Sequence, residues 1–452
     1  MRSLSLGQKL FAGQKITLMG LGLLGRGVND AKFLAESGAD LIVTDLKTEE
    51  ELRTSVDQLK NFPNIKFILG EHRLKDFRER DLIVRGAGTP SDSPYLAEAR
   101  EQNLKITMST ALFAKYAIAS NAKIIGITGT RGKSTVTHLL FEIVKKAFGA
   151  SRQIFLGGNV KDVATLPFLN QIKPGDLAVL ELDSWQLQGF GEEKISPQLA
   201  IFINFFPDHL NYYRGDLERY FADKANIFLN QTADDNLIIG GQVAPMIEKT
   251  FGLKIKSRIT TTIPTDFPAD WPHQLLGEHN CYNFALAVAA SKVLNIPLEI
   301  IRETIANFTG VPGRLELIRE YRGIKIYNDT TATTPEATLA GLKALAREKK
   351  LILIMGGADK NLDLSHLVKA IPRYCREIIL LPGTGTDKLK LEWPNHKTKM
   401  LGEAVSLALK LAHVGDVILL SPAFASFGPP PGGFKNEFDR GEQFNQLIKK
   451  FK

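Results

Sequence analysis

The sequence predicts an α/β protein whose parallel sheets are distributed over three domains. A chain of 452 residues is too long for a single hydrophobic core. Short continuous runs of Val, Ile and Leu recur along it, and each is followed by glycine and then by a stretch with helical periodicity. Strands of that composition are buried on both faces, so we expect parallel sheets that helices cover on both sides.

The predicted strands fall into three groups along the chain. They cover residues 15–20, 41–45 and 81–86, then 123–129, 177–183 and 199–204, and finally 351–357, 377–383 and 417–421. Between the strands, apolar residues repeat with helical spacing, as in Val136, Leu139, Leu140, Ile143 and Val144. Boundaries near residues 107 and 312, the second within the Gly- and Pro-containing segment "GVPGR", predict domains 1–107, 108–312 and 313–452.

Composition excludes several classes of protein. The net charge of +8 comes without a run of five Lys or Arg, so we expect no nucleic-acid partner and read the charge as suited to anionic small molecules. The two cysteines, Cys281 and Cys375, are too far apart in sequence for a zinc or disulfide motif. No signal-peptide pattern and no apolar run of membrane-spanning length is present, so we expect a cytoplasmic monomer with no membrane partner.

The first glycine-rich loop follows the first predicted strand. Gly20, Gly22 and Gly25 form the pattern G-x-G-x-x-G, and Asp45 ends the next strand. This spacing is typical of dinucleotide-binding domains. Glycines there let the backbone approach a diphosphate at a helix N-terminus. That requirement leaves three alternatives open, namely NAD or FAD, another nucleotide such as a UDP derivative, and a tight turn with no ligand.

The second glycine-rich loop, "GITGTRGKST" (126–135), follows the predicted strand 123–129 and opens a helix. Five residues separate Gly126 from Gly132, one more than in the strict P-loop. Backbone N–H groups would hold ATP phosphates, Lys133 would meet the β and γ oxygens, and Ser134 or Thr135 would contact Mg²⁺. The predicted ATP-binding residues of this loop are Gly129, Thr130, Arg131, Gly132, Lys133, Ser134 and Thr135.

This loop resembles that of the Mur ligase family, ATP-dependent amide-forming enzymes of peptidoglycan assembly; folylpolyglutamate synthetases carry a related loop. Further segments match family motifs in the same order over nearly the whole chain, most closely those of the D-glutamate-adding members. The matching segments are "ELDSWQL" (181–187), "NFFPDHLNYY" (204–213), "YFADKANIF" (220–228), "GEHNCYNFALAVAA" (277–290), "VPGRLELI" (311–318), "IYNDTTATTPEAT" (326–338), "IMGGADKNLDLS" (354–365), "LSPAFASF" (420–427) and "FKNEFDRGEQF" (434–444). The resemblance implies an N-terminal Rossmann-like domain, a central P-loop ATPase-like parallel sheet and a C-terminal Rossmann-like domain.

The resemblance also implies the catalytic and metal-binding residues. Lys133, His209 and Lys224 would be catalytic, with Lys224 carbamylated by CO₂. One Mg²⁺ would be held by Ser134 and Glu181, because this hard cation prefers oxygen ligands, and a second metal by His209 and the carbamylated Lys224. Outside the loop, ATP would be contacted by Asn283, Arg314 and Asp329.

The substrates implied are UDP-N-acetylmuramoyl-L-alanine and D-glutamate, so the first glycine loop would bind a uridine nucleotide and not NAD. The residues expected to line the uridine pocket are Leu23, Leu24, Asp45 and Lys47, with Asn159 near the same substrate. The residues expected to hold the incoming amino acid are Thr333, Lys360 and Ser426.

Three features depart from the family pattern. Thr331 stands where a lysine that pairs with a carboxylate of D-glutamate is expected, so the amino-acid pocket lacks one cation. The insertion "GPPPGGF" (428–434), expected to be a loop, lies between two pocket motifs, and Glu437 precedes Phe438 where an aromatic residue is expected first. The alternatives are therefore a ligase for another amino acid or for folate glutamates, an NAD-dependent oxidoreductase, and a P-loop protein that hydrolyses ATP without ligation.

Overall fold

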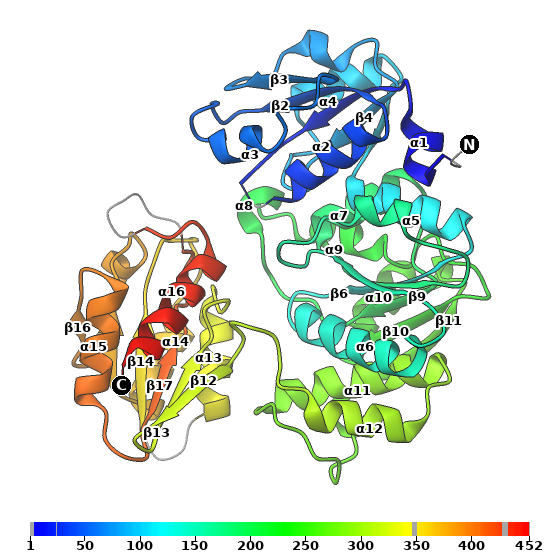
Figure 1. Cartoon of the computed structure of the whole chain (residues 1–452). Coiled ribbons are helices and arrows are strands. Elements are labelled where there is room, and N and C mark those ends of the chain that lie inside the picture. The colour runs from blue at the N-terminus through cyan, green and yellow to red at the C-terminus, as the bar shows by residue number, and fades with distance from the viewer. Residues whose placement is uncertain (1–3, 24, 346–349, 427–432, 452) are drawn as a thin grey trace. The chain divides into compact units, whose positions relative to one another are not determined.

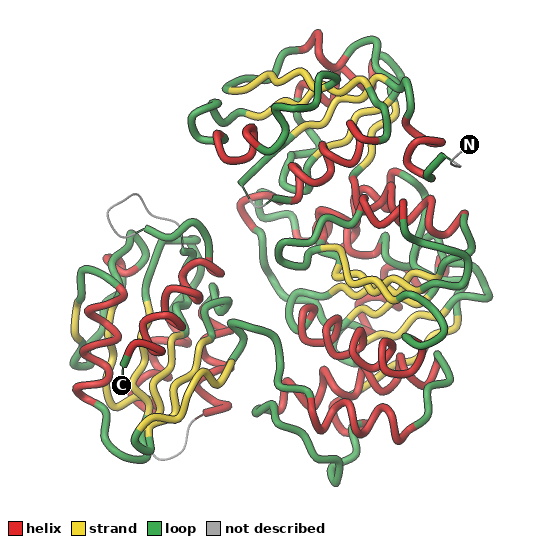
Figure 2. The backbone as a smooth tube through the Cα atoms, viewed as in Figure 1, coloured by secondary structure: helices red, strands yellow, loops and turns green. Residues whose placement is uncertain are grey.

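The computed structural model describes residues 4–23, 25–345, 350–426 and 433–451. The chain forms two compact units, the first made of Met1–Trp271 with Tyr282–Ile305 and the second of Pro272–Cys281 with Ala306–Lys452. In each unit, strands lie between layers of helices (Figures 1 and 2), which confirms the predicted α/β class. The first unit contains two sheets and the second contains one. The boundaries at residues 107 and 312 stay a prediction.

The N-terminal sheet has the strand order β3-β2-β1-β4-β5, and all its strands are parallel. The chain reverses its direction of winding at β1, which pairs with β2 on one side and β4 on the other. The loops that leave the carboxyl ends of strands at such a reversal diverge and form a crevice. The elements are α1 (Leu6–Phe11), β1 (Lys15–Met19), α2 (Arg26–Glu36), β2 (Asp40–Asp45), α3 (Arg53–Asp57), β3 (Ile65–Leu69), β4 (Leu82–Arg85), α4 (Pro94–Glu101) and β5 (Lys105–Thr107).

The central sheet is also entirely parallel, with the order β11-β10-β9-β6-β8-β7. The strand β6 lies between β8 and β9, so the segments that follow these three strands meet at one edge. The strands are β6 (Lys123–Thr128), β7 (Ile154–Gly158), β8 (Leu177–Glu181), β9 (Leu199–Phe202), β10 (Asn236–Gly240) and β11 (Arg258–Thr262). The helices are α5 (Ser109–Ala119), α6 (Lys133–Phe148), α7 (Ser184–Glu192), α8 (Leu210–Tyr213), α9 (Leu217–Ala225), α10 (Ala244–Phe251), α11 (Glu278–Val293) and α12 (Leu298–Asn307).

One continuous hydrophobic core joins the two sheets of the first unit. It includes Phe11 and Leu34 from the N-terminal layers, and Phe113 and Phe190 from α5 and α7. The predicted apolar face of α6, including Leu139, is also buried. Burial of side chains from both layers in one core holds the N-terminal sheet in a fixed position against the central sheet.

The sheet of the second unit has the order β12-β13-β17-β14-β15-β16. It is mixed, because the edge strand β12 runs antiparallel to β13 whereas the other pairs are parallel. The strands are β12 (Glu316–Tyr321), β13 (Ile324–Asn328), β14 (Leu351–Met355), β15 (Cys375–Leu380), β16 (His396–Lys397) and β17 (Val417–Leu420). The helices are α13 (Pro335–Leu345), α14 (Ser365–Tyr374), α15 (Leu401–Leu411) and α16 (Glu437–Lys450).

The predicted loop 428–434 lies outside the described residues except for its last two positions. Within the described ranges, no helix has both the length and the apolar character that crossing a bilayer would require.

Candidate functional site

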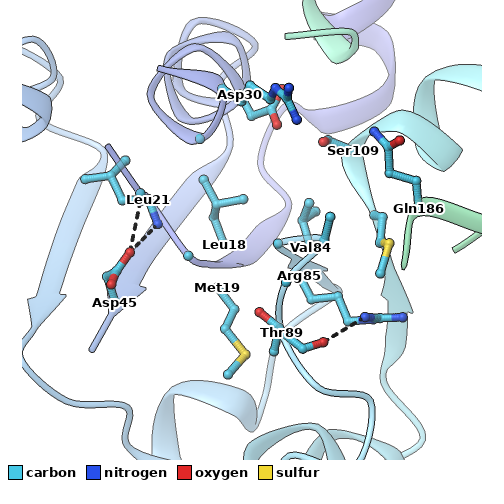
Figure 3. Close-up of a pocket in the computed structure, with 18 of the residues that line it drawn as sticks. Leu18, Met19, Leu21, Asp30, Asp45, Val84, Arg85, Thr89, Ser109 and Gln186 are labelled. Atoms are coloured by element: carbon cyan, nitrogen blue, oxygen red, sulfur yellow. Dashed lines mark hydrogen bonds between the residues drawn. The ribbon is translucent and has the colours of Figure 1, made fainter. Parts of the chain in front are cut away.

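A cavity of about 870 Å³ opens in the first unit at the winding reversal of the N-terminal sheet (Figure 3). Its walls come from the loops after β1 and β4, where the topology predicts a crevice, and from the facing central layers. The lining residues include Gly20, Leu21, Gly22 and Leu23 after β1, Asp45 at the end of β2 and Lys47 after it, Arg85 at the end of β4 with Gly86 and Thr89 after it, and Ser109, Thr110, Gly158 and Gln186 from the central layers.

Asp45 holds the first glycine loop in place. Its Oδ2 accepts hydrogen bonds from the backbone N–H groups of Leu21 at 2.9 Å and Gly22 at 3.0 Å (Figure 3). Its Oδ1 accepts one from the N–H of Lys47 at 2.9 Å. Three of the residues predicted to bind uridine, Leu23, Asp45 and Lys47, therefore line one cavity. The fourth, Leu24, lies outside the described residues.

Asn159 connects this cavity to the central sheet. Its Oδ1 accepts a hydrogen bond from Nη1 of Arg26 at 2.9 Å, and its backbone N–H donates to the carbonyl oxygen of Glu181 at 2.7 Å. Gly158, with φ 81°, permits this approach, because a Cβ at that position would lie 2.1 Å from the same Glu181 oxygen. Arg26 and Gly158 both line the cavity. Asn159 is thus placed next to the cavity wall, beside the strand that carries Glu181.

The second glycine loop connects β6 to the N-terminus of α6. Gly132 has φ 83°, and a Cβ there would lie 2.4 Å from Oδ1 of Asn283. Glycine is therefore required both by the left-handed backbone and by the close approach of Asn283. The Nζ of Lys133 donates to the carbonyl oxygens of Gly129 at 3.0 Å and Thr130 at 3.1 Å. The loop leaves the N-terminus of a 16-residue helix available to an anion.

The segment after β9 braces this loop. The backbone N–H of Thr130 donates to the carbonyl oxygen of Asn204 at 3.0 Å, and the N–H of Arg131 donates to Oδ1 of Asn204 at 2.9 Å. The hydroxyl of Thr130 donates to the carbonyl oxygen of Phe206 at 3.1 Å. Because β6 and β9 are neighbours in the sheet, the two segments meet at their carboxyl ends.

Lys224 lies buried beneath the second glycine loop. It is 1% exposed, and its Nζ donates to the carbonyl oxygen of Gly129 at 2.9 Å and to Oγ1 of Thr128 at 3.4 Å. The ring of Tyr220 lies 5.0 Å from the same nitrogen. Burial, with a smaller contribution from the positive charge of Lys133, holds the pKa of Lys224 well below its usual value. The carboxylates that oppose this shift are Asp183, Asp208 and Glu181.

His209 lies at the same site. Its ring packs on Trp185 with centroids 4.7 Å apart, and its backbone N–H donates to Oδ1 of Asp208 at 2.8 Å. Burial lowers the pKa of His209, and the charges of Lys133 and Lys224 lower it further. The structure therefore gathers side chains that come from the loop after β6, the end of β8, the segment after β9 and helix α9. They are Lys133, Glu181, His209 and Lys224.

The acidic part of this cluster is suited to a metal that completes its shell with other oxygens. In the described ranges, no group of three or more His, Cys, Asp or Glu could hold a metal by itself. Glu181 is 3% exposed, and its negative charge acts on Lys224. Burying a carboxylate is unfavourable unless it is paired, and a cation would stabilise it. Mg²⁺ is usually bound by one or two carboxylates together with phosphates and water, which fits this arrangement with Ser134 in the first turn of α6.

A second group of predicted residues lies in the second unit, at the carboxyl ends of the neighbouring strands β13, β14 and β17. The Nζ of Lys360 donates to Oγ1 of Thr333 at 3.0 Å. The hydroxyl of Ser426 is buried and has no hydrogen-bond partner among the described residues. Thr331 instead turns its hydroxyl to the backbone and donates to the carbonyl oxygen of Gly313 at 2.9 Å.

Asp329 is a buried carboxyl in this second group. Its Oδ1 accepts from the N–H of Leu315 at 3.1 Å, and its Oδ2 accepts from the hydroxyl of Ser421 at 2.8 Å. Burial raises the pKa of Asp329 to about 7, against the opposing charge of Arg314. Arg314 and Asp329, both predicted to contact ATP, therefore interact with each other.

Comparison with known proteins agrees with this arrangement. The Mur ligase middle domain matches residues 127–263, and the Mur ligase glutamate ligase domain matches residues 313–424. The UDP-N-acetylmuramoylalanine–D-glutamate ligase of Roseiflexus sp. is 34% identical over 478 residues, covering 97% of this chain and 99% of that protein. The enzyme of the same name from Borreliella burgdorferi is 34% identical over 455 residues, covering 95% and 96%. This chain belongs to the Mur ligase family.

Solved structures confirm the fold of this Mur ligase. The UDP-N-acetylmuramate–alanine ligase of Thermotoga maritima has a TM-score of 0.61 at 17% identity, covering 97% of this chain and all of that one. The MurF ligase of the same organism, solved with ADP, has a TM-score of 0.60 at 16% identity and covers both chains completely. Three-domain Mur ligases are thus the structural neighbours of the chain.

Three residues that the structure of this Mur ligase places at the site were not predicted from the sequence. Asn204 and Asp183 lie inside motifs quoted from the sequence, so their positions were available but their contacts were not. Asp183 begins α7 by accepting the N–H of Gln186 at 2.7 Å, and it interacts electrostatically with His209 and Lys224. Arg85 ends the apolar run of β4, and a charge at the end of a buried strand was its signal.

Proposed function

We propose that this Mur ligase joins D-glutamate to UDP-N-acetylmuramoyl-L-alanine, using ATP and Mg²⁺ and passing through an acyl phosphate. We propose further that it acts as a cytoplasmic monomer. The single observation that carries the proposal is the buried Lys224, whose Nζ lies 2.9 Å from the carbonyl oxygen of Gly129 in the phosphate loop. It supports a site in which a lysine of lowered pKa and the basic second glycine loop lie around one bound anion. The Glu181 carboxylate belongs to the same site.

The cavity of the N-terminal sheet would hold the uridine nucleotide. Leu23 and Lys47 offer an apolar surface and a cation, and Asp45 keeps the backbone of the glycine loop open toward the cavity. The diphosphate would lie at the N-terminus of α2, where backbone N–H groups and the helix dipole favour negative charge. Asn159, between Arg26 and Glu181, would guide the rest of the substrate toward the central sheet.

The phosphate loop would bind ATP with the γ-phosphate toward Lys133. Backbone N–H groups in the first turn of α6 would face the phosphates, and Asn283 lies beside Gly132. Lys133 would leave its present carbonyl acceptors and neutralise charge on the transferring group. Mg²⁺, when bound through Ser134 and Glu181, supplies further charge neutralisation and orientation. The substrate carboxylate then attacks the γ-phosphorus, which becomes bonded to that carboxylate as ADP leaves.

Lys224 would act as a carbamate. A carbamate forms when a neutral amine attacks CO₂ and releases one proton, so an amine of lowered pKa at neutral pH favours the reaction. The product is an anion buried close to His209 and Lys133. This anion and His209 would position the groups that stabilise the acyl phosphate while the amine of the amino acid attacks its carbonyl carbon and phosphate departs.

The second unit would supply the amino acid. Lys360 offers a cation and Ser426 an unpartnered buried hydroxyl, both suited to a carboxylate of the incoming substrate. Arg314 and Asp329 would contribute to the ATP site. Thr331 cannot pair with a carboxylate and is already bonded to Gly313, so the side-chain carboxylate of D-glutamate depends on fewer cations here than the family pattern implies.

The proposal is tested by incubating the protein with ATP, Mg²⁺ and UDP-N-acetylmuramoyl-L-alanine, and adding one amino acid at a time. We expect D-glutamate to couple best to phosphate release and to yield a product with the mass of the amide. Faster coupling to another amino acid would overturn the substrate assignment, and phosphate release that ignores every amino acid would overturn ligation. Retention of NAD by the protein would restore the oxidoreductase alternative.

A further inference from the structure

A fully buried arginine lies in the wall of the substrate cavity. Arg85, at the carboxyl end of β4, has a side chain with 0% exposure and lines the cavity together with Thr89 (Figure 3). Its Nη1 donates to the carbonyl oxygen of Thr89 at 3.1 Å, and its Nη2 donates to Oε1 of Glu192 at 3.0 Å. Its Nε has no hydrogen-bond partner among the described residues. A buried charge held in this way fixes the positions of its partners, because the loss of any partner leaves the charge uncompensated and destabilises the folded protein.

The guanidinium also reaches the helix that follows Glu181. Nη2 of Arg85 donates to Oε1 of Gln188 at 3.0 Å, and that oxygen accepts a second bond from the hydroxyl of Tyr212 at 3.2 Å. The amide Nε2 of Gln188 donates to Oδ2 of Asp223 at 2.6 Å. These three side chains, Arg85, Gln188 and Asp223, form a continuous hydrogen-bonded connection from β4 through α7 to α9, which we name the Arg85 relay.

The far end of the Arg85 relay is next to Lys224. Asp223 and Lys224 are consecutive in α9, so a bond that holds Asp223 also sets the rotation of the helix about its axis. On the other side, Lys224 bonds to Gly129 in the phosphate loop. Helix α9 is therefore held at one residue by the wall of the nucleotide cavity and at the next by the ATP site.

We propose that Arg85, Gln188 and Asp223 are positioning residues for Lys224, and that a ligand in the cavity strengthens their hold. The unpartnered Nε of Arg85 is a donor that an oxygen of the ligand, or a water ordered by it, can satisfy. Satisfying it restrains the guanidinium, and the restraint passes through Gln188 to α9. The inference rests on the proposed function, in which the cavity takes the uridine nucleotide and Lys224 carries a carbamate.

The test uses Gln188→Met in the full-length protein, because methionine keeps the volume and the Arg85–Glu192 pair while removing all three hydrogen bonds of the amide, to Arg85, Tyr212 and Asp223. The carbamate on Lys224 is measured by ¹³C NMR with labelled bicarbonate, with and without UDP-N-acetylmuramoyl-L-alanine and in the absence of ATP. In the unmodified protein we expect the ligand to raise carbamate occupancy. In Gln188→Met we expect the ligand to bind with a similar affinity and the occupancy not to respond.

Kinetics provide a second readout. Loss of a residue that orients a catalytic group typically lowers the rate about tenfold or more, so kcat of Gln188→Met should fall about tenfold with little change in KM for the nucleotide substrate. Asp223→Ala should behave in the same way. Asp223→Asn keeps an oxygen that can accept from Gln188 and should retain most of the activity.

The matched control is Lys115→Met. Lys115 pairs with Glu193 at 2.7 Å, next in sequence to Glu192, but this pair does not lead to Asp223. We expect Lys115→Met to lower stability while leaving the carbamate response to the ligand intact. An unaltered response in Gln188→Met, or no response in the unmodified protein despite measured binding, would overturn the inference. Failure of the proposed function would give a different result. There would be either no carbamate signal that depends on Lys224 or no nucleotide binding at all.

Discussion

Lys133 and Lys224, which lie far apart in the sequence, donate hydrogen bonds to the same carbonyl oxygen, that of Gly129. Two ammonium groups around one neutral acceptor repel each other, and the charge of Lys133 contributes to the lowered pKa of Lys224. An anion at this position would relieve the repulsion. The proposed mechanism contains two such anions, a nucleotide phosphate and the carbamate on Lys224.

Lys133→Ala should abolish ligation while leaving the fold intact. Removing one preorganised donor to a developing charge lowers rates by a hundredfold or more, and we expect ATP-dependent phosphate release to fall by at least about that factor. Lys145→Ala, on the exposed face of the same helix, is the control and should be unaffected. Unchanged turnover in Lys133→Ala would show that the phosphate loop does not bind ATP as proposed.

Lys224→Ala should lose activity and recover part of it when short carboxylates such as formate or acetate are added. The small acid would occupy the volume and supply the negative charge of the missing carbamate. Activity is measured against carboxylate concentration at constant ionic strength. Lys133→Ala serves as the comparison, since a cation cannot be replaced by an acid. Equal recovery of both variants, or none at any concentration for Lys224→Ala, counts against the carbamate.

Gly132→Ala should weaken ATP binding. The added Cβ would lie 2.4 Å from Oδ1 of Asn283 and the residue would keep φ near 83°. We expect KM for ATP to rise about tenfold with nucleotide-sugar binding unchanged, because strain and clash together amount to about 1–3 kcal/mol. Gly175→Ala separates the two effects, as its φ is 87° and nothing lies within 4 Å of its Cβ. That control should lower stability slightly and leave KM for ATP as it is.

Asp30→Asn should stabilise the first unit at alkaline pH more than at acidic pH. Burial raises the pKa of Asp30 to about 7 from its ordinary 3.8, against the opposing effects of Ser109 and Arg26. Between these values the folded state binds more protons than the unfolded state, so stability decreases as pH rises toward 7 and stays low above it. Asparagine lacks this titration. Scanning calorimetry should show a gain in Tm of about 3 °C or more at pH 8 that shrinks toward pH 5.

An equal gain in Tm at both pH values would contradict the titration of Asp30 and point to packing alone. Asp57→Asn, at an exposed carboxylate of α3, is the control and should show no such pH dependence.

Much of the fold could be predicted from the sequence because buried parallel strands are continuous apolar runs. The strands β1, β6 and β14 were predicted from this signal. The edge strands β11 and β12 were not, because their side chains are largely exposed and their sequences mix polar and apolar residues. The antiparallel β12 made the last sheet mixed, which a pattern of apolar runs does not specify.

The sequence by itself determined the local structures that we propose carry the chemistry: two glycine loops that open helices, a carboxylate at the end of a strand, and lysines in α6 and α9. These features are local, since they depend on backbone freedom and on the distance a side chain can reach. Only the tertiary structure decided which strand ends are neighbours, and so which side chains meet. The order of β8, β6 and β9 brings Glu181, the second glycine loop and His209 to one edge. The contacts of Lys224 with Gly129 and of Arg85 with Gln188 join segments about a hundred residues apart, and their geometry follows from packing that no local pattern encodes.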